Sequence, residues 1–364
     1  MASSSDPIHI QIGGRKSKLA VLQSYTVKQL LEAKYPNVKC DVLALSTLGD
    51  QVLLQPLYTF GGKSLWTKEL EVLLLGPVDN YPKLDLIVHS LKDMPTHLPA
   101  EFELGAIVNR QDPRDALCMK KDSPYKKLEE LPDGSVVGTS SIRRSAQLLK
   151  NFPNLRFESI RGNIQTRFKK LDDPMGIYSC VVLANAGLVR LGLQSRITQL
   201  LDAPDMYYAV GQGALGIEIR SDDDRVKGLL KPLEDLSTTY CCLAERSLMR
   251  FLEGGCSVPL GVNSSFDQET GRLTLKAILV SPDGRESIED EVSSIINGKD
   301  SAEIVGITLG NRLIENGAQK ILDSVDTHTV NEPPSAIMTD CSGANTPEPP
   351  VMMNPDVNRI HNVN

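Results

Sequence analysis

The sequence predicts an α/β protein with two doubly wound domains, followed by a smaller α+β domain at the C-terminal end. Short apolar runs alternate with segments of helical periodicity as far as Leu183, which is the pattern of doubly wound sheets. The chain has 364 residues, too many for one ordinary hydrophobic core. After Leu233 two successive strands joined by a tight turn replace this alternation, and the change indicates a third unit.

The first alternating run lies before about residue 110. His9–Gly13 is expected to be a strand, and Ser17–Ala33 an amphipathic helix, because apolar residues recur along one of its faces. Cys40–Ser46 is expected to form a second strand. Leu84–His89 is a short apolar run of the kind found in buried parallel strands.

The second alternating run follows a polar stretch, Asn109–Asp115, which suits a linker. Strands are expected at Val136–Gly138, Leu155–Ile160 and Cys180–Leu183. Helices are expected between them, at Ile142–Lys150 and at 164–171, the second of them capped by Asn163.

The third unit is expected to begin with a helix at Tyr240–Glu253. Two strands, Leu273–Val280 and Ser287–Val292, flank the turn residues Ser281-Pro282-Asp283-Gly284 and predict a hairpin. A helix at Ala302–Leu322 closes the unit. The segment 326–364 has six prolines, no lysine and no sustained periodicity, so it is expected to be disordered.

The composition limits the classes of function. A net charge of −7 argues against nonspecific binding to nucleic acid or to anionic membranes. The N-terminal residues have no basic region followed by an apolar run, so no signal peptide is expected. The seven cysteines have no paired spacing, so we expect free thiols in a reducing cytoplasm. No Cys and His cluster has zinc spacing, and no metal site is expected.

A concentration of positive charge stands out against this acidic background. Residues 139–170 hold eight basic residues and one acid, Glu158, a local charge of +7. Such a run is commonly a solvated face. Here, however, Arg143 and Arg144 fall in the first turn of a predicted helix, where the macrodipole disfavours cations unless an anion is bound. Hydroxyl donors at Thr139, Ser140 and Ser141 precede that turn, and these features together favour an anion-binding cleft.

The N-terminal half repeats this arrangement at two predicted strand ends. Arg15 and Ser17 follow the first strand, and Lys92 and Asp93 follow the strand that ends at His89. Ligands of open α/β sheets bind outside the carboxyl ends of strands, and Arg binds carboxylates in bidentate fashion. Asp93 is the one carboxylate among these residues, which fits either a structural ion pair or a proton-transfer group.

Cys256 lies in Gly254-Gly255-Cys256-Ser257-Val258-Pro259, where glycines and a proline suggest a loop that exposes the sulfur. The alternative is a buried apolar cysteine, the commoner state of a lone Cys. Gly211-Gln212-Gly213-Ala214-Leu215-Gly216 matches a dinucleotide-binding pattern, but a predicted strand follows it where that site requires a helix.

Six motifs resemble those of the hydroxymethylbilane synthase (porphobilinogen deaminase) family, in the family's order. They are VHSLKDMPT (88–96), GTSSIRRSAQL (138–148), RGNIQTR (161–167), AGLVRLGL (186–193), VGQGALGIE (210–218) and EGGCSVP (253–259). GGKSLWTKELE (61–71) also resembles the family's flexible lid over the active site. The matches span roughly residues 8–325.

The resemblance implies two domains like those of periplasmic binding proteins and a third that carries a cysteine-bound cofactor. We expect domain 1 at residues 7–110 and 214–232, domain 2 at 113–210 and domain 3 at 235–325. It implies a dipyrromethane cofactor held by a thioether to Cys256. It also implies that four porphobilinogen units are joined stepwise, each losing ammonia, before hydrolysis releases hydroxymethylbilane. Separately, we expect the protein to be a monomer.

The resemblance also assigns roles to residues. Asp93 matches the catalytic aspartate, which protonates the departing amine and stabilises the cation that forms. Gln212 matches a position at the hinge side of the cleft. The expected ligands of the cofactor and substrate carboxylates are Arg15, Ser17, Lys63, Lys92, Thr139, Ser140, Ser141, Arg143, Arg144, Arg161, Arg167 and Arg190.

Two other classes of protein share some of these features. A non-catalytic two-domain anion receptor would have the same cleft but would need neither Cys256 nor Asp93. A nucleic-acid-binding protein would use the basic segment together with stacking aromatic residues. Both alternatives predict a chain without a covalent cofactor.

Overall fold

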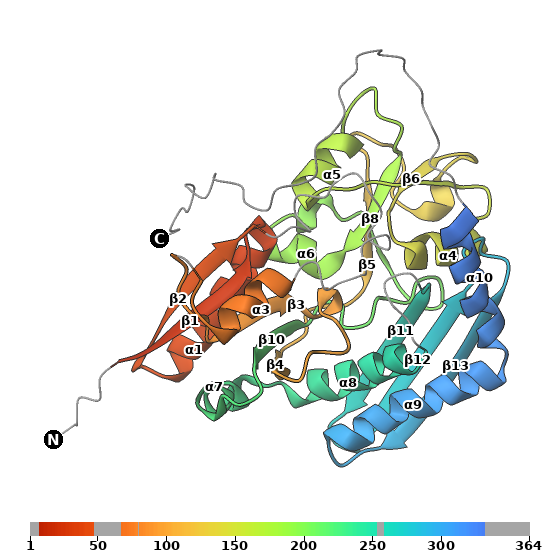
Figure 1. Cartoon of the computed structure of the whole chain (residues 1–364). Helices are drawn as coiled ribbons and strands as arrows, with labels where there is room; N and C mark the ends of the chain where they lie inside the picture. The colour runs from red at the N-terminus through yellow and green to blue at the C-terminus, as the bar shows by residue number, and fades with distance from the viewer. Residues whose placement is uncertain (1–6, 47–66, 79, 253–257, 332–364) are drawn as a thin grey trace, which may run out of the picture.

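The computed structural model describes residues 7–46, 67–78, 80–252 and 258–331, and within them three separate β-sheets organise the chain (Figure 1). In the view of Figure 1, one five-stranded sheet lies at the left, the other at the upper right and the three-stranded sheet at the lower right. Among the described helices, none combines the length and apolarity that crossing a membrane requires.

The first sheet has the strand order β2-β1-β3-β10-β4. Its strands are β1 (Ile8–Arg15), β2 (Val38–Leu45), β3 (Leu86–Ser90), β4 (Phe102–Val108) and β10 (Leu215–Arg220). Helices α1 (Lys18–Lys34) and α7 (Asp224–Leu230) pack on one face, and α3 (Lys68–Leu75) on the other. Since both faces are covered, β3 is buried at four of its five positions, as its apolar sequence run predicted.

The second sheet has the order β7-β6-β8-β5-β9. Its strands are β5 (Asp115–Met119), β6 (Val136–Gly138), β7 (Arg156–Glu158), β8 (Cys180–Ala184) and β9 (Gln199–Leu201). Its helices are α4 (Ile142–Asn151), α5 (Ile164–Leu171) and α6 (Asn185–Arg190). The Asn163 side chain caps α5 by accepting a hydrogen bond from the Thr166 amide at 2.8 Å, as expected.

The third sheet is an antiparallel meander of β11 (Leu260–Asp267), β12 (Arg272–Val280) and β13 (Ser287–Ile295). Helices α8 (Leu236–Phe251), α9 (Lys299–Glu315) and α10 (Ala318–Asn331) complete this unit. Short 3₁₀ helices lie at Leu91–Asp93, Leu128–Glu130, Gln194–Arg196 and Lys231–Leu233. The predicted fold class, two α/β sheets and a smaller α+β unit, is confirmed.

Three expectations about local structure were wrong. The helix expected at Ala302–Leu322 is two helices, because Gly317 has a φ of +97° that ends the first of them. Helix α10 continues to Asn331, so the boundary at residue 326, predicted for the start of a disordered segment, was placed too early. The linker expected at Asn109–Asp115 was also one residue too long, since Asp115 is the first residue of β5.

The chain passes between the first two sheets twice, after β4 and before β10. Strand β10 then inserts between β3 and β4 and runs antiparallel to both. The two passages place the end of β3, the start of α1 and the helices of the second sheet around one shared space (Figure 1).

Candidate active site

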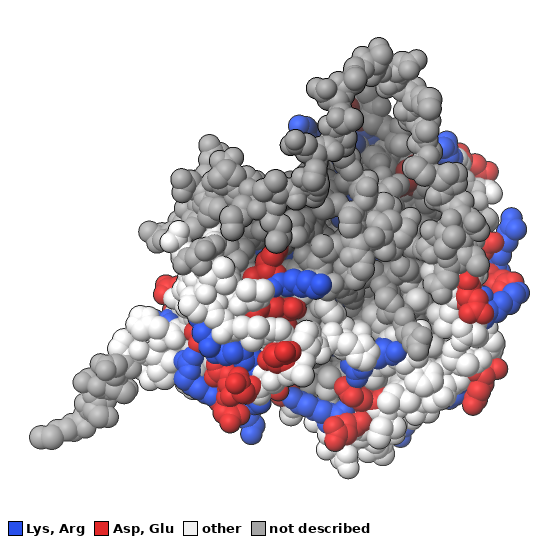
Figure 2. Space-filling model, in the orientation of Figure 1, with Lys and Arg blue, Asp and Glu red and all other residues white. Residues whose placement is uncertain are grey.

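A cleft of about 750 Å³ lies between the first and second sheets. Its described lining contains one acid, Asp93, and nine basic residues: Arg15, Lys16, Lys18, Lys92, Arg144, Arg161, Arg167, Lys170 and Arg190. On the outer face shown in Figure 2, acidic and basic side chains are instead interspersed. The cleft therefore concentrates positive charge in a protein of net charge −7, as the basic segment predicted.

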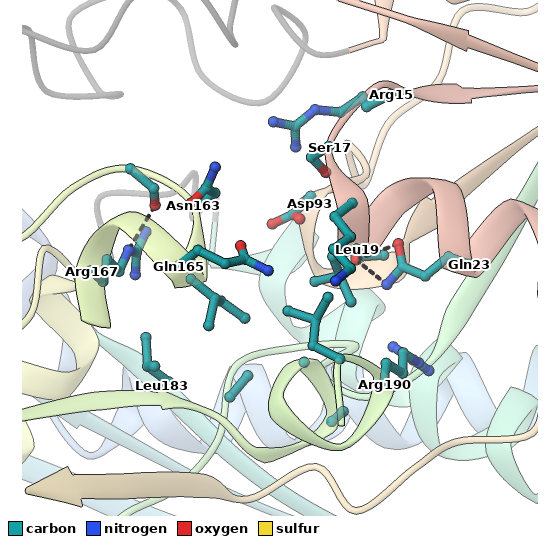
Figure 3. Close-up of a pocket in the computed structure, with 18 of the residues that line it drawn as sticks. Arg15, Ser17, Leu19, Gln23, Asp93, Asn163, Gln165, Arg167, Leu183 and Arg190 are labelled. Atoms are coloured by element: carbon teal, nitrogen blue, oxygen red, sulfur yellow. Dashed lines mark hydrogen bonds between the residues drawn. The ribbon is translucent and has the colours of Figure 1, made fainter. Parts of the chain in front are cut away.

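Arg15, Ser17 and Asp93 lie on one side of the cleft (Figure 3). Ser17 is the N-cap of α1, and its hydroxyl accepts a hydrogen bond from the Ala20 amide at 3.3 Å. Asp93 ends the 3₁₀ helix that follows β3 directly. Behind it, Gln23 of α1 and Ser90 of β3 are hydrogen-bonded at 2.7 Å and fix the end of the strand. Arg15 and Asp93 thus reach the cleft from the ends of β1 and β3.

Gln165 and Arg167 of α5 face these residues across the cleft (Figure 3). The Arg167 guanidinium donates to the Gly162 carbonyl at 2.8 Å, and burial with the nearby Arg144 and Arg161 lowers its pKa to about 10. Arg190, on α6, donates to the Gly213 carbonyl at 2.7 Å, and burial lowers its pKa to about 10. Both guanidiniums are held by carbonyls that do not neutralise them, which leaves their charge available to an anion.

A buried network lies beneath the cleft. Asp115 is fully buried, and its carboxylate accepts from Arg144 at 2.7 Å and pairs with Arg143 at 2.8 Å. Burial raises the pKa of Asp115, but the two guanidiniums outweigh it and hold that pKa well below its usual range. Gln212 donates to Asp115 at 2.9 Å and accepts from Lys92 at 3.3 Å.

This network corrects the prediction for the first turn of α4. The anion beside Arg143 and Arg144 is Asp115, a carboxylate of the protein itself. Arg144 still reaches the cleft, whereas Arg143 is not among its lining residues and donates to the Tyr207 carbonyl. Gln212 likewise does not line the cleft, and its side chain connects Lys92 to Asp115.

The three predicted hydroxyl donors before α4 do not line the cleft either. The Thr139 hydroxyl accepts from the Ser141 amide at 3.2 Å, and Ser140 donates to the Ile160 carbonyl at 2.8 Å. They therefore shape the turn between β6 and α4. The remaining predicted ligands in the described chain, Arg161 and Lys92 included, are brought together by the cleft.

Two predicted residues, Lys63 and Cys256, lie outside the described residues. The neighbouring helix α8 ends at Phe251, and the description resumes at Val258 shortly before β11. Among the described residues, no group of three or more His, Cys, Asp or Glu side chains could hold a metal ion.

Asp115 and the cleft residues Lys18 and Gln23 were not predicted from the sequence. Asp115 was assigned to the linker, although it stands directly before the apolar run Ala116–Met119, and an acid at the edge of a buried strand is a signal for a buried ion pair. Gln23 offered a similar signal, because it is a polar residue on the inner side of α1.

Anion binding in the cleft is expected to be sensitive to alkaline pH, because Lys92 lines it. Burial lowers the pKa of its ammonium to about 8, although Asp93 opposes the change. The group is therefore charged below pH 8 and neutral above it. We expect KM for an anionic substrate to rise about tenfold between pH 7 and 9.5, because a charge-assisted hydrogen bond is lost. Steady-state kinetics of Lys92→Arg is the control, since Arg stays charged and its KM should remain flat over this range.

Comparisons with known proteins show which family models and structures this chain resembles. Residues 10–228 match the family model of the porphobilinogen deaminase dipyromethane cofactor binding domain, and residues 239–315 match the C-terminal domain of porphobilinogen deaminase. A periplasmic aliphatic sulphonate binding protein of Escherichia coli, a solved structure, is 16% identical with a TM-score of 0.36, over 67% of this chain and 75% of its own.

Three curated relatives are named porphobilinogen deaminase. That of Candida albicans is 64% identical over 92% of this chain and 98% of its own. The relative from Debaryomyces hansenii is 62% identical over 94% of this chain and 92% of its own, and that from Saccharomyces cerevisiae 57% over 88% and 98%. These matches confirm the resemblance that the motifs carried. With one family model covering 219 residues of 364 and relatives matched over nearly their whole length, the chain belongs to the porphobilinogen deaminase family.

Proposed function

We propose that this chain joins four porphobilinogen molecules into linear hydroxymethylbilane by extending a dipyrromethane primer, bound through a thioether to Cys256. Its family consists of transferases of heme biosynthesis that use this cofactor. The observation that carries the proposal is the cleft, whose described lining has nine basic residues around one acid. Each porphobilinogen brings an acetate and a propionate group, so a growing chain of pyrroles requires many cations in one place.

The residues of the cleft fit the cofactor. A dipyrromethane built from two porphobilinogen units carries four carboxylates, and the cations from both sheets can hold them without neutralising Asp93. Arg161, Arg167 and Arg190 would hold carboxylates from the second sheet, while Arg15 and Lys92 would hold them from the first. When bound, the cofactor supplies the free pyrrole carbon that attacks the incoming substrate.

Asp93 performs the proton transfers in this proposal. Its carboxyl group donates a proton to the aminomethyl nitrogen of porphobilinogen, the carbon–nitrogen bond breaks, and ammonia leaves. The resulting carboxylate then stabilises the positive charge left on the substrate's methylene pyrrole. After the new carbon–carbon bond forms, the same carboxylate accepts the proton lost from the α-carbon of the attacking pyrrole ring, which restores the acid for the next cycle.

The residues around Asp93 support these transfers by fixing the positions of the neighbouring charged side chains. Gln212 links Lys92 to the buried Asp115, so the ammonium beside Asp93 has a fixed position. Arg144 faces the cleft while its other contacts go to Asp115 and the Val182 carbonyl. Lys63 is proposed to contact substrate carboxylates from the segment before α3.

The proposed domain boundaries are residues 7–110 and 214–232 for domain 1, 113–210 for domain 2 and 235–325 for domain 3.

The denatured intact mass of the purified protein tests this function. We expect an adduct of two linked porphobilinogen units on the wild type and a bare chain for Cys256→Ala, because the thioether needs the Cys256 sulfur. Cys241→Ala is a matched control, since Cys241 is a free, buried thiol and should leave the adduct in place. A bare wild-type chain after expression with porphobilinogen would contradict the proposal and favour an anion receptor.

We further propose that the protein acts as a monomer in the cytoplasm, with porphobilinogen and the growing polypyrrole as its partners and without nucleic acid or membrane. Five cysteines of the described chain are free and buried, which suits a reducing compartment. The net charge of −7 disfavours nonspecific binding to nucleic acid and to anionic membranes. Light scattering of the purified protein should return the 39.8 kDa mass of one chain.

A further inference from the structure

A buried arginine on α8 makes contacts that the proposed chemistry does not use. Arg246 is 4% exposed, and its guanidinium donates to the Pro95 carbonyl at 2.7 Å and to the Met94 carbonyl at 3.4 Å. Among the described residues, its hydrogen-bond partners are thus carbonyl oxygens of one short segment, rather than a carboxylate. Burying a charge without a paired carboxylate costs free energy, so we expect this arginine to perform a specific role.

The two carbonyls belong to the residues directly after Asp93. The segment is anchored at its other end, because the Leu91 amide donates to the Ala214 carbonyl at 3.0 Å. The Met94 amide in turn donates to the Leu91 carbonyl at 3.1 Å and closes the 3₁₀ helix. Asp93 lies between these anchors, so Arg246 fixes the backbone on one side of the reactive carboxyl group.

Arg246 makes this contact from another part of the fold. Helix α8 packs against β11 and α9 of the third unit and also contacts β4 of the first sheet (Figure 1). The residue before it, Glu245, is fully buried and accepts from Arg110 and from the Gly211 amide, both at 2.7 Å. Two consecutive charged residues of α8 therefore hold two backbone segments that lead to the cleft.

The same helix leads to the proposed cofactor attachment, since α8 ends at Phe251 and Cys256 follows in the next segment of the sequence. Because Arg246 of α8 holds the carbonyls directly after Asp93, the helix fixes the position of the proposed proton donor. A misplacement of about 1 Å between reacting groups can cost about 100-fold in rate.

We propose that Arg246 is a positioning residue that holds the Asp93 turn in register with the cofactor-bearing unit through the carbonyls of Met94 and Pro95. The inference rests on the proposed function, which assigns proton transfer to Asp93 and cofactor attachment to Cys256. Arg246 itself is not among the residues that line the cleft and contacts no reacting atom in this proposal.

The test compares Arg246→Met and Arg246→Lys with Arg250→Met. Arg250 lies one turn further along α8 and pairs with Glu303 at 2.8 Å, so its variant removes the same charge from the same helix. For each variant we would measure the intact mass, kcat and KM for porphobilinogen below the unfolding temperature, and hydrogen exchange of the peptide 88–98.

For Arg246→Met we expect the cofactor adduct to be present, KM within about twofold, kcat lowered about 10- to 100-fold and faster exchange at Leu91 and Met94. Arg246→Lys should recover part of kcat, because an ammonium can still donate to the Pro95 carbonyl. Arg250→Met should keep kcat within about twofold and leave exchange of the peptide unchanged.

Three results would overturn the proposal. The first is a wild-type kcat for Arg246→Met with its adduct present, and the second is an equal loss of kcat in Arg250→Met. The third is a missing adduct in Arg246→Met alone, which would assign the residue to cofactor attachment. Should Arg246→Met not fold, unchanged kcat and exchange in Arg246→Lys would have the same meaning. A wild type without adduct instead contradicts the proposed function itself.

Discussion

Replacing Asp93 with Asn is expected to lower kcat for porphobilinogen by about 10²- to 10⁴-fold, the usual contribution of a positioned general acid–base group. The amide keeps the shape of the side chain but can neither donate an acidic proton nor carry the negative charge that stabilises the cation. KM should stay equal or fall, because Asp93 is the one acid among the nine described bases of the cleft. Steady-state kinetics on the folded variant measures both constants.

Asp93→Glu provides the matched control for this loss. It retains a carboxyl group that can transfer protons, although its longer side chain misplaces the group, so its kcat should fall between those of the wild type and Asp93→Asn. A kcat for Asp93→Asn near that of the wild type would mean that another group transfers the proton. The structural ion-pair role considered for Asp93 would then be preferred.

Asp115→Asn is expected to lower the free energy of unfolding by about 3–5 kcal/mol, the range for breaking a buried ion pair by removing one partner. Arg143 and Arg144 are each 6% exposed and would be left facing each other without a counter-charge. Urea unfolding monitored by circular dichroism measures the change. The wild-type stabilisation should be present above about pH 4, the ordinary range of an Asp carboxyl group, and be lost as the pH falls toward the lower folded pKa.

Asp112→Asn is the comparison for Asp115→Asn, because Asp112 pairs with Arg114 at 2.7 Å with both side chains about one-third exposed. Such a pair is screened by water and should cost less than about 1 kcal/mol. Equal losses in the two variants would show that burial of Asp115 does not set its contribution. A small loss in both would mean that Arg143 and Arg144 find other acceptors.

The local elements of the fold were largely predictable because each depends on nearby residues. Apolar runs gave β3 and β8, and Ser17 and Asn163 gave the starts of α1 and α5. The direction of β10 was not predictable in this way. Its antiparallel insertion between β3 and β4 depends on residues more than 100 positions away, and periodicity does not encode a partner.

The site was predicted as a set of charges, and less well as a set of contacts. The basic segment correctly indicated the cleft, since helix starts and strand ends place charges at one edge of a sheet. The sequence could not show that Asp115 would occupy the place of the expected anion beside Arg143, because that contact joins two separate elements. The roles of Lys63 and Cys256 stay predictions that rest on the family motifs.

The insertion of β10 also has a consequence for synthesis on the ribosome. The strands of the second sheet lie within residues 115–201, so that unit can fold as soon as it emerges. The first sheet cannot, because β4 has no partner among the earlier strands and must wait for Leu215–Arg220. Until then β3 and β4 present unpaired edges, which can attract other chains. The nascent protein therefore completes its second unit while its first is unfinished, and a chaperone would be needed most during that interval.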